Sequence, residues 1–271
     1  MKTVRDLLAL NRGISRSEAR LLLAHCLGTV PETLIAHPEQ EVNDTTAHAF
    51  EAMLAHAAEG CPIPYLVGKQ AFWGRDFLVT PAVLIPRPDT ETLVEAALHT
   101  ITDKPLNVLE LGTGSGCIAI TLALEKPFAQ VTATDISSEA LEVACENARR
   151  FGVKNLTFRS GSWFDAVPNE SLFDLIVSNP PYIAEGDPHL PALAWEPITA
   201  LTSGPDGLDD IRRLASEALF HLTEDGVLAL EHGFDQGQRV REILQQLGYR
   251  SVMTLQDLAG NHRVTQGFRP V

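Results

Sequence analysis

Long apolar segments and paired cysteines are both missing from this sequence. No run reaches the roughly 20 uncharged apolar residues that a membrane-spanning helix needs, and the charged N-terminus lacks the apolar core of a signal peptide. None of the cysteines forms a C-x-x-C pair or a cluster with histidine, and they are widely spaced: Cys26, Cys61, Cys117 and Cys145. We therefore expect a cytoplasmic protein with reduced thiols, no metal site and no membrane association.

Positive charge is also scarce. The chain has 21 Lys and Arg against 35 Asp and Glu, a formal net charge of −14. In residues 86–271 the count is 14 against 26, a net charge of −12. Proteins that bind nucleic-acid phosphates across a broad face need clustered Lys and Arg. The composition therefore predicts no stable nucleic-acid binding.

Apolar residues make up 45% of the 271, enough for a full core, and a prior of about 150 residues per domain indicates two domains. Residues 1–62 predict a small all-helical domain, because apolar residues recur three and four positions apart after Ser15 and again within 45–58. Residues 63–88 are rich in aromatic and β-branched residues around Gly74, which is typical of a β-hairpin linker.

Residues 89–271 alternate strand and helix patterns, which predicts an α/β domain with a mostly parallel sheet. The expected strands lie at 107–111, 131–135, 156–160, 173–178, 226–232, 249–255 and 262–268. The loop between the last two strands is too short to hold a crossover helix, so these strands must pair antiparallel. This is the order of a Rossmann-like, seven-stranded methyltransferase sheet.

A G-x-G-x-G turn directly follows the first of these strands and opens an apolar helix. Glycines let the backbone turn tightly and let a ligand approach it closely, which makes the turn a candidate cofactor site, although a plain βα turn is the alternative. Its residues are Gly112, Thr113, Gly114, Ser115 and Gly116.

Two further side chains follow the next strands. Asp135 ends the second strand, where an acid can accept both ribose hydroxyls of a nucleoside; a helix N-cap is the alternative. Trp163 follows the third strand, where its ring can stack on an adenine, although a Trp in a loop more often simply packs.

The strongest motif, Asn-Pro-Pro-Tyr, ends the fourth strand. Two prolines remove two N–H donors, so that the Asn179 side-chain oxygen and a backbone carbonyl remain as acceptors for a planar NH₂ group. Holding both hydrogens orients a nitrogen whose lone pair is otherwise delocalised, and methyl transfer then needs little general base. We therefore predict Asn179, Pro180 and Tyr182 as catalytic, and Pro181 with them as substrate-binding; an ordinary β-turn is the alternative.

In these motifs the chain resembles the bacterial release-factor glutamine N5-methyltransferases, the HemK family. The segments that carry the resemblance are ELGTGSG, Asp135, GSWF, SNPPY, IPRPDTE and DLAGNHRVTQG. The resemblance implies that residues 112–116, Asp135, Trp163 and Asn179 contact S-adenosylmethionine, which becomes S-adenosylhomocysteine. It also implies that residues 179–182 hold the glutamine of the Gly-Gly-Gln loop of class 1 peptide chain release factors. Residues 1–62 would then be a substrate-docking domain.

Other activities remain open at this point. The Asn-Pro-Pro-Tyr motif is shared with enzymes that methylate adenine N6 in DNA, so a nucleic-acid base or another protein glutamine is the alternative substrate. A non-catalytic protein that binds S-adenosylmethionine is a third hypothesis. The sequence also leaves several roles undecided: Arg87, Asp89 and Glu91 can close the site or form caps and salt bridges, and Glu110 can contact the donor or be structural.

Overall fold

The computed structural model describes residues 2–10, 13–101 and 104–271. The chain divides into two compact units, Met1–Lys69 and Gln70–Val271, and each is described by itself. The sequence predicts a helical domain at 1–62, a linker at 63–88 and a catalytic domain at 89–271. These boundaries differ from the observed division mainly in the linker. The hairpin strands fall almost entirely in the second unit.

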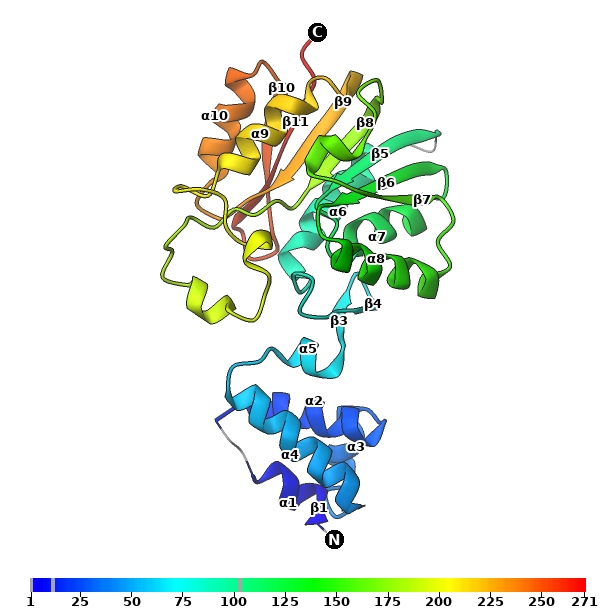
Figure 1. The fold of residues 1–271 in the computed structure, drawn as a ribbon, viewed down its shortest axis with the longest axis vertical. Helices are drawn as coiled ribbons and strands as arrows, with labels where there is room; N and C mark the ends of the chain where they lie inside the picture. Colours follow the sequence, from blue (N-terminus) through cyan, green and yellow to red (C-terminus); the bar gives the residue numbers. More distant parts are fainter. Residues whose placement is uncertain (1, 11–12, 102–103) are drawn as a thin grey trace. The chain divides into compact units, whose positions relative to one another are not determined.

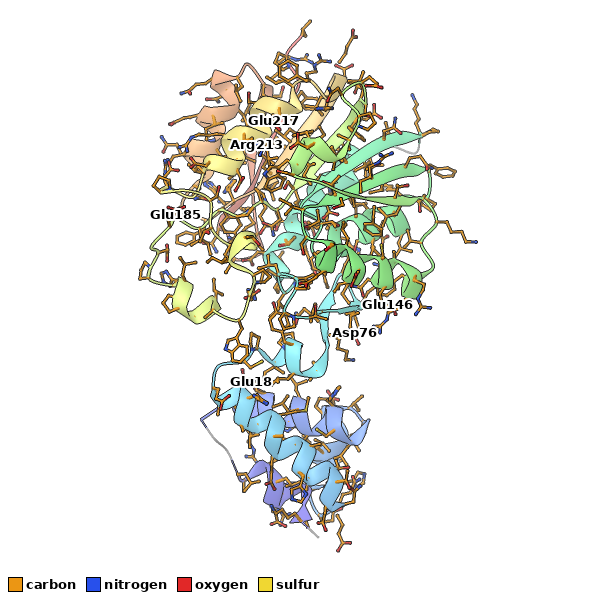
Figure 2. The ribbon with its side chains drawn as sticks, viewed as in Figure 1. Glu18, Asp76, Glu146, Glu185, Arg213 and Glu217 are labelled. Atoms are coloured by element: carbon orange, nitrogen blue, oxygen red, sulfur yellow. The ribbon has the colours of Figure 1, made fainter. Side chains whose placement is uncertain are left out.

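The first unit is helical, as the apolar spacing predicts. Its elements are β1 (Lys2–Thr3), α1 (Val4–Leu8), α2 (Arg16–Leu27), α3 (Pro31–Ala36), β2 (Glu41–Val42), α4 (Asp44–Ala58) and α5 (Ile63–Val67). Ser15 begins α2 with a capping box, because its hydroxyl accepts from the Glu18 N–H while the Glu18 carboxylate, labelled in Figure 2, accepts from the Ser15 N–H. Leu22 of α2 and Phe50 of α4 are fully buried in the core of this unit.

The hairpin consists of β3 (Lys69–Phe72) and β4 (Arg75–Leu78). Trp73 and Gly74 form its turn with φ values of 49° and 69°, and two positive φ values in a two-residue loop match the twist of the flanking strands. Phe72 and Phe77 meet edge to face, with ring centroids 6.0 Å apart, and both belong to the hydrophobic core of the second unit. The hairpin is thus anchored to that unit.

The second unit contains the predicted seven-stranded sheet. Its strands are β5 (Leu106–Leu111), β6 (Ala129–Asp135), β7 (Leu156–Ser160), β8 (Phe173–Ser178), β9 (Leu222–Glu231), β10 (Arg250–Gln256) and β11 (His262–Phe268). Their order is β10-β11-β9-β8-β5-β6-β7, and β11 runs antiparallel to both of its neighbours. The predicted fold class is confirmed.

Helices cover both faces of this sheet (Figure 1). On one face lie α6 (Glu91–Thr100), α7 (Cys117–Glu125) and α8 (Ser138–Phe151), and on the other lie α9 (Asp209–Ala218) and α10 (Gly237–Gln246). Strand β9 shows why the central strands read as continuous apolar runs: Val227 and Ala229 enter one core, whereas Leu228 and Leu230 enter the other.

Helix α9 has one buried and one charged face. Ile211 and Leu214 are fully buried against the sheet, while Arg213 and Glu217 form an outward ion pair at 2.8 Å (Figure 2). This amphipathic packing fixes the start of the helix, where Asp210 lies. The described residues of this unit also form 3₁₀ turns: η1 (Pro88–Thr90), η2 (Trp163–Ala166), η3 (Leu190–Leu193) and η4 (Ile198–Ala200).

Candidate active site

A cavity of about 480 Å³ lies at the carboxyl ends of β5, β6, β7 and β8. In an open parallel sheet this edge is where ligands bind. Of the predicted site residues, the cavity lining includes Gly112, Thr113, Gly114, Ser115, Asp135, Trp163, Asn179 and Pro181. Three predicted residues are not part of this lining: Gly116, Pro180 and Tyr182.

The glycine turn is held by the neighbouring strand. The N–H groups of Gly112 and Thr113 both donate to the Thr134 carbonyl at 2.9 Å. Gly116, with φ of 81°, is buried, and a Cβ there would lie 2.8 Å from Ile120 Cδ1 and 3.1 Å from Ala144 Cβ. This residue therefore lets α7 pack against α8, whereas the first four residues of the turn face the cavity.

Both carboxylate oxygens of Asp135 accept hydrogen bonds from backbone N–H groups. Oδ2 accepts from the Gly114 N–H and Oδ1 accepts from the Ser137 N–H, each at 2.9 Å. The N-cap residue of α8 is instead Ser137, whose hydroxyl accepts from the Ala140 N–H at 3.1 Å. A carboxylate has about four acceptor positions, so Asp135 is fixed in place and still able to accept two ligand hydroxyls.

Trp163 forms a rigid wall of the cavity. Its backbone has a positive φ of 50°, and its indole N–H donates to Asp210 Oδ1 at 3.2 Å. The ring lies against the glycine turn, because a Cβ on Gly112 would be 3.3 Å from Trp163 Cζ3. Asp210 also lines the cavity, although its surroundings in the sequence, GPDGLDD, read as a solvated loop. The sequence feature that could have identified Asp210 is its position in the first turn of a helix.

Asn179 enters the cavity from the end of β8. Its amide Nδ2 donates to the Thr90 hydroxyl oxygen at 3.3 Å, and no described residue donates to its Oδ1. Asn179 thus presents a hydrogen-bond acceptor. Pro180 and Pro181, neither of which has an N–H, are buried beside it.

Tyr182 faces β9 instead of the cavity lining. Its hydroxyl donates to Glu231 Oε1 at 3.5 Å, and its carbonyl accepts from Gln236 Nε2 at 2.9 Å. Burial and the nearby Glu231 raise the pKa of the Tyr182 hydroxyl well above its usual value, so it stays protonated. Gly207 is required here, because a Cβ at that position would lie 2.2 Å from the Tyr182 carbonyl oxygen.

Two carboxyl groups at strand ends are fully buried. Burial raises the pKa of Glu110 to about 8 and that of Glu231 to about 7, against the hydrogen bonds that favour the ionised forms. Glu110 Oε2 accepts from the Thr113 hydroxyl at 2.5 Å and from the Ala119 N–H at 3.1 Å. Glu110 therefore holds the glycine turn against α7. These contacts agree with a structural role for Glu110, the alternative to a contact with the donor.

The segment 85–91 closes one side of the cavity. Arg87 lines the cavity and forms an ion pair with the buried Glu196, whose Oε2 also accepts from the Ile85 N–H at 3.1 Å. This pair joins the segment to the loop before η4, and Thr199 and Ala200 of η4 reach the lining. Arg87 thus lies beside the cavity and is held there by Glu196.

Asp89 and Glu91 make structural contacts instead. Asp89 pairs with Arg263 at 3.0 Å, and Glu91 accepts from the Trp73 N–H at 2.7 Å, which holds the hairpin. Within the described residues no group of three His, Cys, Asp or Glu is arranged to hold a metal ion. None of the helices in the same residues is long and apolar enough to cross a membrane.

The reversed β11 and the ligand-sized cavity at the carboxyl edge of the parallel strands are those of a methyltransferase. Residues 102–265 match a family model described as a methyltransferase domain, and residues 2–68 match one described as the PrmC N-terminal domain. Two solved structures share the fold. A methyltransferase from Pyrococcus furiosus aligns with a TM-score of 0.56 at 24% identity, covering 82% of this chain and 98% of that one. The 16S rRNA N2 G1207 methyltransferase of T. thermophilus aligns with a TM-score of 0.54 at 18% identity, covering 74% and 49%.

Relatives with similar sequences identify the family within this class of methyltransferases. Release factor glutamine methyltransferase of Xylella fastidiosa (strain Temecula1) is 46% identical, with 97% of each chain covered. That of Bordetella pertussis is 45% identical over 99% of this chain and all of the relative, and that of Escherichia coli K12 is 40% identical over 93% and 91%. The chain belongs to the release factor glutamine methyltransferase family.

Proposed function

We propose that this chain transfers a methyl group from S-adenosylmethionine to the side-chain nitrogen of the glutamine in the Gly-Gly-Gln loop of class 1 peptide chain release factors. The observation that carries the proposal is the orientation of Asn179. Its Nδ2 is engaged by Thr90, and its Oδ1 is left as an acceptor in a cavity that Asp135 and the glycine turn also line.

The residues of the cavity fit the donor. A volume of about 480 Å³ lies within the usual range of small-molecule sites, about 300–1,000 Å³. Asp135 offers two free acceptor positions for the ribose diol, residues 112–115 let the ligand approach the backbone, and the Trp163 ring offers a face for the adenine. When bound, S-adenosylmethionine supplies an electrophilic methyl group on a sulfonium centre.

The chain's own residues orient the accepting nitrogen. Asn179 Oδ1 accepts one hydrogen of the glutamine amide, a backbone carbonyl of the Asn-Pro-Pro turn accepts the other, and Pro181 limits the space around it. Held in this way, the nitrogen directs its electron pair at the methyl carbon as the S–C bond breaks, and the electrons of that bond stay on sulfur. The nitrogen then loses a proton to water. The rate gain comes from proximity and fixed dipoles.

Charge favours a protein substrate over a nucleic acid. The chain carries a net charge of −14, so a phosphate backbone approaching the cavity meets repulsion, whereas a loop on a folded protein does not. We assign residues 1–62 the role of a docking surface for the release factor, and the reaction to the cytoplasm, where translation ends.

The test uses the whole chain, labelled S-adenosylmethionine and a class 1 release factor purified from cells that lack the enzyme. Mass spectrometry should locate one methyl group on the glutamine of the Gly-Gly-Gln loop. A short peptide with the same loop should react far more slowly. Methylation of DNA, or equal rates on peptide and whole release factor, would contradict the proposal.

A further inference from the structure

The Trp163 indole is held by the start of helix α9. Its Nε1–H donates to Asp210 Oδ1 at 3.2 Å, across 47 positions of the sequence. Arg213, one turn further along α9, pairs with Asp165 of the same 3₁₀ turn at 3.8 Å. Two contacts thus fasten η2 to a helix that is itself packed on the sheet, and one of them ends on the ring that lines the cavity.

The backbone of Trp163 needs such a support. Its φ of 50° lies in the left-handed region, which is unfavourable for a residue with a bulky side chain and persists only where surrounding contacts hold it. The ring also lies so close to the glycine turn that a Cβ on Gly112 would be 3.3 Å from its Cζ3. The indole is therefore confined by Gly112 at its six-membered ring and by the Asp210 carboxylate at its N–H.

Asp210 is itself fixed independently of its side chain. Its backbone N–H donates to the Ser203 hydroxyl at 2.7 Å, and the next residue, Ile211, is fully buried. Removal of the Asp210 carboxylate should therefore leave the helix start in place and release only the indole. The adjacent Asp209 is exposed and is not part of the cavity lining, so the same helical turn also contains a matched control.

We propose that Asp210 is a positioning residue for the donor: it holds the Trp163 ring in the orientation that stacks on the adenine, so that this surface exists before the donor binds. The inference rests on the proposed function, because it takes Trp163 as the surface for the adenine. A preorganised ring improves affinity, since the ligand does not have to order the side chain when it binds. Asp210 does not need to touch the donor, and its effect passes through the indole N–H.

Equilibrium titration of the full chain with S-adenosylhomocysteine tests the proposal. Asp210→Ala removes the acceptor and should weaken binding about 3- to 10-fold, the cost of ordering one freed side chain. Asp210→Asn keeps an acceptor oxygen and should stay within about twofold of the wild type. Asp209→Ala removes an acid from the same helical turn and should leave the Kd unchanged. Wild-type affinity in Asp210→Ala would overturn the inference.

A double-mutant cycle shows whether the effect passes through the indole. Trp163→Phe keeps an aromatic face but has no N–H, so it breaks the same hydrogen bond from the other side. In this background Asp210→Ala should change the Kd less than about twofold. A loss of the same size in both backgrounds would mean that Asp210 acts on the donor directly, which would also overturn the inference.

The freed indole should be visible in the protein without donor as well. After Trp73→Phe and Trp195→Phe, Trp163 is the only tryptophan of the chain. Its time-resolved fluorescence anisotropy should show little local motion in this background, and a fast local component once Asp210→Ala is added. An indole that stays equally rigid would contradict the proposal, even where affinity falls.

Failure of the proposed donor site looks different. If the adenine does not lie on this ring, Trp163→Ala leaves the Kd for S-adenosylhomocysteine unchanged, and both the site and the inference fall. If only the inference is wrong, Trp163→Ala weakens binding whereas Asp210→Ala does not. The identity of the methylated substrate does not enter any of these measurements.

Discussion

The two halves of the cavity are built in different ways. The half assigned to the donor is local: Gly114 lies in the turn after β5, Asp135 ends the adjacent parallel strand β6, and a single hydrogen bond of 2.9 Å joins them. The half assigned to the glutamine gathers Thr90, Asn179 and Glu231 from widely separated parts of the chain. The first half is made largely of backbone and glycine, whereas the second depends on side chains that orient one another. Mutations should therefore affect binding in the first half and turnover in the second.

The largest expected effect is on the glutamine side. Asn179→Ala removes an acceptor that works in the transition state, and loss of one such preorganised group typically costs about 10²–10³ in rate. We expect this loss in single-turnover methyl transfer at saturating donor, with a smaller effect on the Kd for S-adenosylmethionine, which Asn179 is also expected to contact. A large loss of donor affinity instead would place Asn179 in the other half of the cavity.

Asp135→Ala should show the reverse pattern. Each charge-assisted hydrogen bond to a ribose hydroxyl contributes about 1.5–3 kcal/mol, so donor affinity should fall at least about tenfold. At saturating donor the rate of methyl transfer should recover much of its wild-type value. Equilibrium titration and single-turnover kinetics on the same preparation measure both quantities. Unchanged affinity in a folded variant would remove Asp135 from the donor site.

Gly116→Ala separates packing from binding within the glycine turn. The residue has φ of 81°, and the new Cβ would lie 2.8 Å from Ile120 Cδ1 and 3.1 Å from Ala144 Cβ, so strain and overpacking should destabilise the fold by about 2 kcal/mol. Gly114→Ala is the matched variant, since φ is also positive but nothing lies within 4 Å of the added Cβ. Denaturant unfolding should rank Gly116→Ala as the less stable. The opposite ranking would contradict the packing role.

The sequence predicts the sheet because each strand carries its own local signal. Apolar runs give the seven strands, and the short loop before β11 gives its reversed direction; both are confirmed. Gly112, Asp135 and Asn179 stand out for the same reason, since Asp135 ends a strand and the other two directly follow one, and their roles remain proposals. The orientation of Tyr182 toward β9 depends on tertiary packing and could not be predicted.

Residues that depend on distant partners escaped the sequence analysis. Thr90 and Asp210 lie in the segments PRPDTE and GPDGLDD, neither of which ends a predicted strand. Glu231 reads as the end of a plain buried strand. One signal was available for Glu231: a carboxyl that ends an apolar strand matches Glu110 near the end of β5, and both prove to be fully buried. Which polar group each would meet is set by chain crossovers that periodicity does not reveal.

The smallest expected effect compares these two acids through the pH dependence of stability. Each has an ordinary pKa when the chain is unfolded and a raised one when it is folded, about 8 for Glu110 and about 7 for Glu231. Above about pH 4.5 the folded form therefore keeps a proton that the unfolded form has lost. The free energy of unfolding must fall as pH rises, by at most about 1.4 kcal/mol per pH unit for each acid, until the folded pKa is passed.

Glutamine at either position removes this proton uptake, so the two variants should flatten different parts of the curve. Glu231→Gln should reduce the slope only below about pH 7, because above that value the carboxyl is ionised in both states. Glu110→Gln should reduce it up to about pH 8. Urea unfolding between pH 5 and 8.5, followed by circular dichroism, measures both slopes. Since Glu110 ties the glycine turn to α7 whereas Glu231 faces Tyr182 and Arg263, only Glu231→Gln should also alter the pH profile of methyl transfer near pH 7. A changed profile in Glu110→Gln would show that the two halves of the cavity are electrostatically coupled.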